Sequence, residues 1–304
     1  NQKADEKEQE AVENRDYLGE MSLAAQLMIT GGEEKEQEKI TRQDRMLIIE
    51  AIIRAAKQSS QERRDQMIAS DLVNVLNLMA DEALKNGQGE SRVSRLREMG
   101  DSVNFFCKDT LSGMVFNRYG APWPDADVTI FELGLFKDEG YEAHRALAFM
   151  GVMNKTMALS EKNQYDERFT IFYGDEIHII TKNVLTAIYL TKCSKMSRKI
   201  GLWLWLATQN VQDFPDGARK MLSMVEFWIC LGMSEVEMKE VERFKPLSEE
   251  ERSLFRSTRK ASGKYVEGVL LCNRFNGLFR NIPPRIMLAL AMTEKHEKTE
   301  RKGL

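Results

Sequence analysis

Residues 169–180 have the sequence Phe169-Thr-Ile-Phe-Tyr-Gly-Asp-Glu-Ile-His-Ile-Ile180. A run of β-forming apolar residues leads directly into two adjacent carboxylates, Asp175 and Glu176, and such a run is typical of a strand in a buried parallel sheet. Acidic side chains are costly to bury, so a pair at the end of an apolar strand needs a cation, a partner or a chemical task. The plainer alternative is a strand that ends at a solvated turn.

Two adjacent acids after such a strand are also the Walker B pattern of nucleoside triphosphatases. In those enzymes the aspartate helps to hold Mg²⁺, usually through water, and the glutamate orients and polarises the attacking water. Asp-Glu pairs after strands are common, so this pattern alone does not separate an enzyme from a solvated turn. Other motifs in the chain are needed to distinguish these two interpretations.

The composition is that of an ordinary globular protein and narrows the possible partners. The 304 residues can bury a substantial core in one large domain or two. The net charge of −3 and the pI of about 5.9 give no general basic field, which argues against a dedicated DNA-binding module. The four cysteines form no CxxC pair, so reduced thiols in a cytosolic compartment are expected. The apolar runs are too short to span a bilayer, and no signal peptide is found.

The first third of the chain predicts a helical module. Residues 1–16 are charged and are expected to form a polar linker. Residues 17–110 place apolar side chains at helical spacing, and these stripes are assigned to a core. Helices are expected over residues 17–30, 41–58, 70–85 and 91–107, with breaks at Gly31-Gly32, Ser59-Ser60 and Asn86-Gly87 and a solvated charged run over 33–39. The opening Asn1 suggests an excised fragment.

The remaining residues, 111–304, predict an α/β core. Strands are expected at 128–133, 169–175, 200–208 and 227–231, with 111–119 as a short strand or turn. Helices are expected at 139–159, 182–196, 219–224, 235–244 and 248–256, and a last one after Pro283-Pro284. Residues 264–272 and 277–281 predict a hairpin closed by Asn276-Gly277. Strands that alternate with helices predict a parallel sheet with both faces covered.

Polar groups follow two of the predicted buried strands. Asp175 and Glu176 end one strand, and Gln209 ends the next in the sequence Ala207-Thr-Gln209. In an open parallel sheet the ligand site lies at the carboxyl ends of the strands, so Gln209 is expected to reach a phosphate or water near Glu176 if the strands are neighbours. A single Gln after a strand is otherwise a loop-capping amide.

The phosphate-binding half of a triphosphate site is missing from the sequence. The loop GxxxxGK[ST] binds the β- and γ-phosphates through its backbone amides and Lys. The nearest match, residues 258–265, ends in Gly263-Lys264-Tyr265 and lacks both the first Gly and the hydroxyl that binds Mg²⁺. The phosphate loop is therefore expected upstream of Asn1, and this fragment alone is expected neither to bind ATP tightly nor to hydrolyse it.

Several motifs together carry a resemblance to a known family. They are Gly174-Asp-Glu-Ile-His178, Arg198-Lys-Ile-Gly201, Ala207-Thr-Gln209 and Pro283-Pro-Arg-Ile-Met-Leu-Ala-Leu-Ala-Met-Thr-Glu294. Over most of its length the chain resembles the C-terminal ATPase region of the conjugative-transfer ATPases of type IV secretion systems, the TraC-like and VirB-type energising ATPases. It is more distantly similar to the FtsK/HerA motor group. The resemblance implies a RecA-like parallel sheet flanked by helices, without its P-loop segment, and residues 17–110 as an all-helical insertion.

The same resemblance implies a role for each candidate residue, with ATP and Mg²⁺ as cofactors. It implies Mg²⁺ handling by Asp175 through water, water activation by Glu176 and γ-phosphate sensing by Gln209. Arg198 resembles the position from which related motors present a cation to the neighbouring subunit. Its alternative is solubilising charge at a helix end, and its competitors as the trans-acting arginine are Arg256, Arg259 and Arg280.

The implied whole protein is a hexamer in the bacterial cytoplasm, held at the inner membrane by secretion-channel components. It would energise DNA or protein transfer or pilus assembly. Two alternatives stay open: a non-catalytic assembly domain with a degenerate nucleotide fold, and a motor that acts directly on duplex DNA, which the net charge does not support.

Three further positions carry expectations of their own. Gly174 replaces the usual aliphatic residue before the acids and is expected to loosen that strand end. His178 is interpreted as a structural residue with no catalytic role. Trp203 and Trp205 alternate with leucines and are expected to pack in the core rather than stack on bases.

Overall fold

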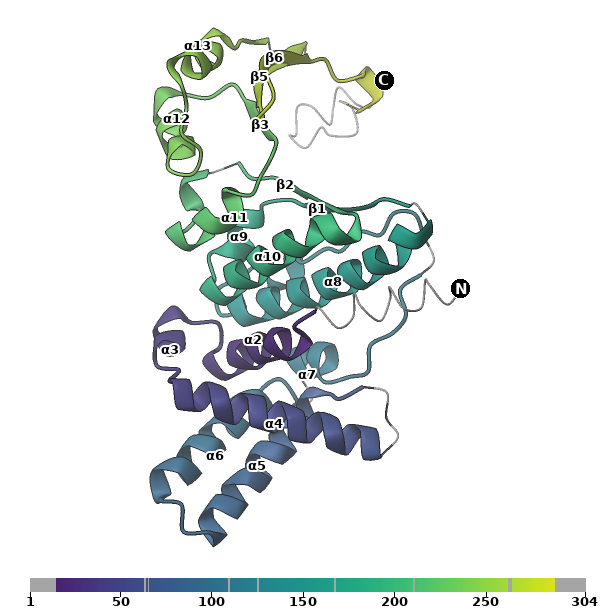
Figure 1. The fold of residues 1–304 in the computed structure, drawn as a ribbon, viewed down its shortest axis with the longest axis vertical. Helices are drawn as coiled ribbons and strands as arrows, with labels where there is room; N and C mark the ends of the chain where they lie inside the picture. Colours follow the sequence, from purple (N-terminus) through teal and green to yellow (C-terminus); the bar gives the residue numbers. More distant parts are fainter. Residues whose placement is uncertain are drawn as a thin grey trace. The chain divides into compact units, whose positions relative to one another are not determined.

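The computed structural model describes residues 15–287 except Arg63, Asp65, Asp109, Asp125, Glu167, Asn210, Ser262 and Gly263. The chain divides into two compact units, Asn1–Gln209 and Asn210–Leu304, and each has its own elements (Figure 1). The expected boundary near residue 110 falls inside the first unit. The assignment of residues 17–110 as an insertion stays a prediction.

From Tyr17 to Asn104 the first unit contains five helices, and four of them lie close to where the sequence predicts helices. They are α2 (Tyr17–Thr30), α3 (Glu34–Glu38), α4 (Arg42–Gln61), α5 (Ala69–Lys85) and α6 (Glu90–Asn104). The C-cap of α2 is Gly31, whose left-handed backbone stops the helix as expected. The charged run 33–39 is solvated as expected and contains the short helix α3, which has no buried residue. Helix α4 continues through Ser59-Ser60 and ends just after them, at Gln61. Helices α4, α5 and α6 share an apolar core built around Leu76 and Met99.

Local capping explains why α4 starts where it does. The Thr41 hydroxyl accepts a hydrogen bond from the Asp44 backbone, and the Asp44 carboxylate accepts one from the Thr41 backbone at 2.9 Å, which completes a capping box. Asp44 also accepts a hydrogen bond from Arg95 of α6 at 3.0 Å. The cap therefore ties the first turn of α4 to α6.

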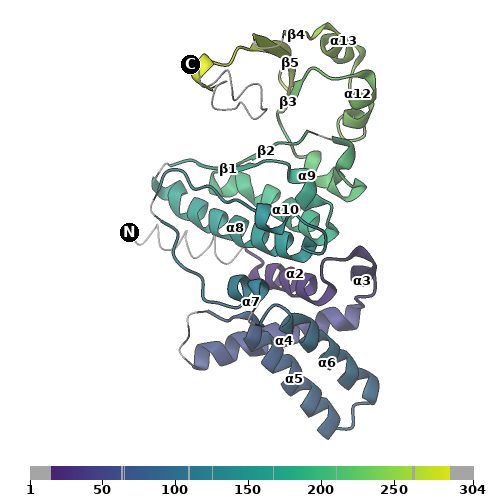
Figure 2. The same ribbon diagram turned by 180° about the vertical axis from the view of Figure 1, so that it is seen from behind.

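Helix α2 lies between these helices and the helices that contact the sheet of the same unit. It packs against α8 (Glu142–Asn163) and α10 (Val184–Ser197), and both views show the three helices together (Figures 1 and 2). The buried Glu20 carboxylate of α2 accepts hydrogen bonds from Arg15 at 3.1 Å and from Asn154 of α8 at 3.2 Å. A charged group is thus buried with its partners between α2 and α8.

The sheet of the first unit has two parallel strands, β1 (Thr170–Gly174) and β2 (Leu202–Leu206), in a register that runs from Thr170↔Leu202 to Gly174↔Leu206. Helices α8 and α10 contact the pair on one face, where the Phe172 ring meets that of Phe149 in α8 at 5.9 Å. The opposite face presents four large apolar side chains, each more than half exposed: Ile171, Tyr173, Trp203 and Trp205. The expectation that both tryptophans pack in the core was wrong, because the described helices of this unit contact only the other face.

Residues 111–136 differ from the prediction. Residues 111–119 contain the helix α7 (Leu111–Phe116) instead of a strand or turn. Residues 128–133 form no strand, and Val128 and Ile130 are exposed. A β-forming sequence becomes a strand only where a neighbouring strand pairs with its backbone, and the described residues offer 128–133 none.

The second unit is built on an antiparallel sheet. Its strands are β3 (Trp228–Leu231), β4 (Lys260–Ala261), β5 (Tyr265–Leu271) and β6 (Asn276–Asn281), with β5 paired to all three others. Its helices are α11 (Arg219–Leu222), α12 (Glu235–Glu242) and α13 (Glu249–Ser257), and α13 is capped by Ser248 as expected. The β5–β6 hairpin is confirmed, but Asn276 and Gly277 lie in β6 rather than in the turn.

The fold class is confirmed only in its coarser form. The described chain is a mixed α/β structure, mostly helical, and its parallel sheet has two strands. The expected third parallel strand is β3, which pairs antiparallel with β5 instead. The parallel sheet covered on both faces was therefore wrong for the described residues. Most of the helix expected after Pro283-Pro284 lies outside them.

Candidate functional site

The carboxyl ends of β1 and β2 are joined by backbone hydrogen bonds. The Ala207 amide donates to the Gly174 carbonyl at 2.8 Å, and the Ile177 amide donates to the Ala207 carbonyl at 3.1 Å. Parallel pairing brings both strand ends to one edge of the sheet. The acidic pair and Gln209 consequently leave the sheet side by side, as the sequence predicts.

Glu176 lies at the centre of this edge. Its φ angle is 47°, the left-handed conformation, and no other non-glycine residue that the structure describes has a positive φ. The residue is the N-cap of α9 (Ile177–Thr181), so the chain turns from strand to helix within two residues. The carboxylate folds back toward the segment that follows β2. There Oε2 accepts a long hydrogen bond from the backbone amide of Gln209 at 3.4 Å.

Asp175 is exposed. Its Oδ1 accepts a hydrogen bond from the Glu176 amide at 3.0 Å. Among the residues described, no three His, Cys, Asp or Glu side chains gather closely enough to hold a metal. One exposed carboxylate fits Mg²⁺ nonetheless, because that ion keeps several waters and takes other ligands from substrate phosphates.

His178, interpreted from the sequence as a structural residue, contacts the candidate site. The side chain is buried, and its Nδ1 lies 2.8 Å from Thr208 Oγ1 and 3.3 Å from Glu176 Oε2. The imidazole therefore touches both strand ends at once. His178 lies two residues after Glu176 in the sequence, and Thr208 lies one residue before Gln209. The tight turn at Glu176 brings these two polar side chains together.

Gly174 does not loosen the end of β1. It is buried, and the ladder continues through it to Leu206. A Cβ atom at this position would lie 3.1 Å from Ile177 Cδ1 and 3.1 Å from the Phe172 ring. The glycine makes room for Ile177, which anchors α9 beneath the acidic pair.

Arg198 lies at the other end of β2. It is exposed in the short turn Arg198–Ile200 that precedes the strand. The five residues of β2 separate it from Gln209, and at ~3.3 Å per residue the separation is roughly 15 Å or more. The structure does not bring Arg198 to Asp175 and Glu176 of its own chain, and the trans-acting role stays a prediction.

The competing arginines belong to the second unit. Arg256 pairs with Glu235 at 2.7 Å and with Glu249 at 2.8 Å, while Arg280 pairs with Glu267 at 2.6 Å. Arg259 precedes β4, and its backbone amide donates to Glu267. Two of the three competitors are thus already engaged in ion pairs within the chain.

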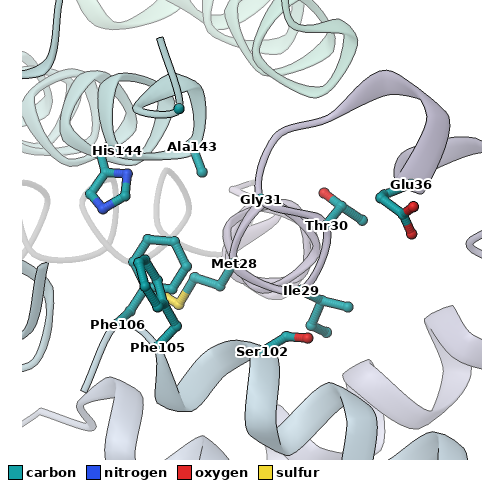
Figure 3. Close-up of a pocket in the computed structure, with 11 residues that line it drawn as sticks. Met28, Ile29, Thr30, Gly31, Glu36, Ser102, Phe105, Phe106, Ala143 and His144 are labelled. Carbon is teal, nitrogen blue, oxygen red and sulfur yellow. The ribbon is translucent and has the colours of Figure 1, made fainter. Parts of the chain in front are cut away.

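A separate cavity of about 340 Å³ lies among α2, the end of α6 and the start of α8 (Figure 3). Its lining includes Met28, Phe105, Phe106 and His144. None of the predicted site residues lines this cavity. It is mostly apolar and is unrelated to the edge that carries the acidic pair.

Comparison with known proteins gives one informative result. No protein-family model and no curated protein sequence matches this chain. Among solved structures, the fold is that of a VirB-type protein. The match is VirB4 of Thermoanaerobacter pseudethanolicus, with a TM-score of 0.64, 15% sequence identity, and coverage of 88% of this chain and 70% of that chain. The resemblance to the VirB-type group is thereby confirmed at the level of the fold. No described helix has the length and apolar character needed to cross a membrane.

Proposed function

We propose that the chain carries part of the catalytic centre of an ATP-hydrolysing motor that energises DNA or protein transfer, or pilus assembly, in a type IV secretion or conjugation system. One observation carries the proposal: the Glu176 carboxylate and Gln209 meet at the carboxyl edge of a parallel strand pair, with 3.4 Å between Glu176 Oε2 and the backbone nitrogen of Gln209. The VirB4 fold supports it.

In this proposal each residue acts through its position. Glu176 orients the attacking water and accepts its proton, which general bases of this kind do when they lie within hydrogen-bond reach. Gln209, exposed at the end of β2, contacts the γ-phosphate. Asp175 holds Mg²⁺ through water, and the ion would neutralise charge on the phosphates when bound.

The centre needs groups from outside these residues. No GxxxxGK[ST] loop occurs in the 304-residue sequence, so the amides and the lysine that bind the phosphates have to come from elsewhere. We expect this chain alone to be inactive. The active form would be a hexamer in the bacterial cytoplasm, bound to membrane components of the secretion channel, with Arg198 offered to a neighbouring subunit and residues 17–110 inserted as a helical module.

The Glu176→Gln substitution in the full-length protein tests the proposal. An amide cannot take a proton from water, so we expect kcat to fall by about 100-fold or more while ATP binding persists. Steady-state hydrolysis and equilibrium binding of nucleotide are the measurements. The control is Glu250→Gln, an exposed residue of α13, which should leave both unchanged. Hydrolysis that persists in Glu176→Gln would remove Glu176 from the mechanism.

A non-catalytic assembly domain is the second candidate, because the similarity to VirB4, at 15% sequence identity, supports the fold and not the activity. Full-length protein that assembles but neither binds nor hydrolyses ATP would establish that function instead. A motor acting on duplex DNA has no support from the net charge of −3. A DNA-binding titration at several salt concentrations tests it, because phosphate contacts by basic side chains make affinity fall steeply with salt.

A further inference from the structure

His178 lies between Glu176 and the residue before Gln209, and the proposed mechanism needs Glu176 and Gln209 in a fixed relative position. Its Nδ1 is 2.8 Å from Thr208 Oγ1 and 3.3 Å from Glu176 Oε2. Thr208 directly precedes Gln209, and Glu176 directly follows Asp175. One buried imidazole nitrogen therefore contacts the last residue before the predicted phosphate sensor and the predicted water-activating carboxylate.

The neighbours of Nδ1 decide which tautomer is present. An ionised carboxylate only accepts hydrogen bonds, so an unprotonated Nδ1 beside Glu176 would set two lone pairs against each other. Nδ1 consequently carries the proton. It donates to Thr208 Oγ1 at 2.8 Å, and the Glu176 carboxylate lies beside this donor, with Oε2 at 3.3 Å from Nδ1.

We propose that His178 is a positioning residue that holds the Glu176 carboxylate against the end of β2, so that the carboxylate follows the position of Gln209. This inference rests on the proposed ATPase function. Glu176 has two contacts to the segment that follows β2, one from the Gln209 backbone amide and one through His178 and Thr208. A displacement of the backbone at Thr208 and Gln209 therefore moves both contacts.

A purely structural histidine would not need this geometry. The hydrogen bond to Thr208 already satisfies Nδ1, and burial of the ring requires nothing from Glu176. Glu176 Oε2 carries a negative charge and lies 3.3 Å from the protonated Nδ1. The carboxylate is attracted to the positive end of the N–H dipole, so the contact restrains the carboxylate that does the chemistry.

Two substitutions at this position differ in the atom that they retain. In His178→Asn the side-chain amide can occupy the place of Nδ1, whereas in His178→Gln it reaches the place of Nε2. In the full-length protein we expect Gln to lower kcat about tenfold or more with KM unchanged. The decrease in kcat should be several-fold smaller for His178→Asn. After β2, Thr208→Ser should likewise lower kcat less than Thr208→Val does.

The outcomes separate the inference from the function on which it rests. Wild-type protein without hydrolysis, or Glu176→Gln with normal hydrolysis, would refute the ATPase proposal. Hydrolysis that depends on Glu176 but is equal in His178→Asn and His178→Gln would overturn the positioning role, whether both stay normal or both fall together with the melting temperature.

A second measurement does not need activity. In a double-mutant cycle of His178→Ala and Glu176→Ala on the unfolding of this chain, each substitution removes the contact, and we expect the two to be non-additive because their side chains touch. Strict additivity would show that His178 does not hold the carboxylate, and would overturn the inference.

Discussion

Glu176 adopts a backbone conformation that its side chain disfavours. At a φ of 47° the Cβ atom crowds the backbone, which costs a non-glycine residue about 1–2 kcal/mol. Strain of this kind persists only where the surroundings impose it, and it concentrates at functional sites. Here it turns the chain from β1 into α9 and brings the carboxylate back to the end of β2.

The strain predicts an unusual order of stability among variants. Glu176→Gly and Glu176→Ala remove the same carboxylate, but only glycine adopts the left-handed conformation without cost. We expect the Gly variant to unfold with a free energy about 1 kcal/mol higher than that of the Ala variant. Urea unfolding of the two proteins measures the difference. Ala as the more stable variant, the order usual in a helix, would contradict the strained conformation.

The site was predictable from sequence only where strand rules apply. Parallel strands end at one edge, so the proximity of Gln209 to Glu176 follows from their places after β1 and β2. His178 could not be found in this way, because its contact with Thr208 depends on the left-handed turn at Glu176. Trp203 and Trp205 were placed wrongly, because alternating apolar residues do not show whether the second face of a sheet is covered.

At the start of α8, five aromatic side chains enclose His144. Their ring centroids lie between 4.8 and 6.2 Å from that of the imidazole, and they belong to Phe105, Phe106, Phe116, Phe136 and Tyr141. Nε2 lies 2.8 Å from Ser112 Oγ, and Nδ1 has no hydrogen-bond partner among the described residues. Burial lowers the pKa of His144, although nearby Glu142 opposes the change.

This lowered pKa predicts that the protein loses stability as the pH falls. The unfolded chain takes up a proton near pH 6.5, while folded His144 stays neutral to lower pH. The unfolded state therefore binds more protons below that point, and the free energy of unfolding should fall by at most about 1.4 kcal/mol per pH unit until the folded pKa is reached.

Thermal unfolding between pH 5.5 and 7.5 measures this dependence. The matched variant is His144→Phe, which keeps an aromatic ring and cannot be protonated. Its melting temperature should change less with pH than that of the wild type. Parallel curves for the two proteins would show that His144 contributes no pH dependence.

Elements with their own capping signals were predictable, and those that rely on partners were not. The predicted bounds of α2 match the observed ones because Gly31 ends the helix locally. The caps Thr41 and Ser248 likewise mark the starts of α4 and α13. Residues 128–133 carried an equally clear β pattern, but a strand needs a pairing edge and the described chain provides them with none.

At the scale of the whole molecule, the two units have separate cores. Phe255 is buried in the second unit with Val269 and Leu271. Leu76 is buried in the first unit among α4, α5 and α6. Each unit thus has apolar side chains of its own to stabilise it.

Calorimetry of single core variants should show this division. Phe255→Ala removes a side chain that is only 1% exposed, and we expect it to destabilise the second unit by about 3–5 kcal/mol. Its effect should fall on one unfolding transition, and Leu76→Ala should lower a different one. A single transition that both variants shift equally would contradict separate cores.

The overall fold was predictable in class and not in topology. Alternating strands and helices correctly indicated a mixed α/β chain, and the motifs pointed to the VirB-type fold. The sequence of β3 is as apolar as those of β1 and β2, yet β3 joins an antiparallel sheet with β5. Composition tells which segments are strands, but pairing partners depend on contacts that are distant in sequence.

The uncovered face of β1 and β2 has an optical consequence. Trp203 and Trp205 are 54% and 52% exposed, side by side with Ile171 and Tyr173. Indole fluorescence shifts to shorter wavelength when water is replaced by apolar contacts. Because β2 leads directly into Thr208 and Gln209, these two tryptophans form an intrinsic emission probe next to the candidate site, and it requires no added label.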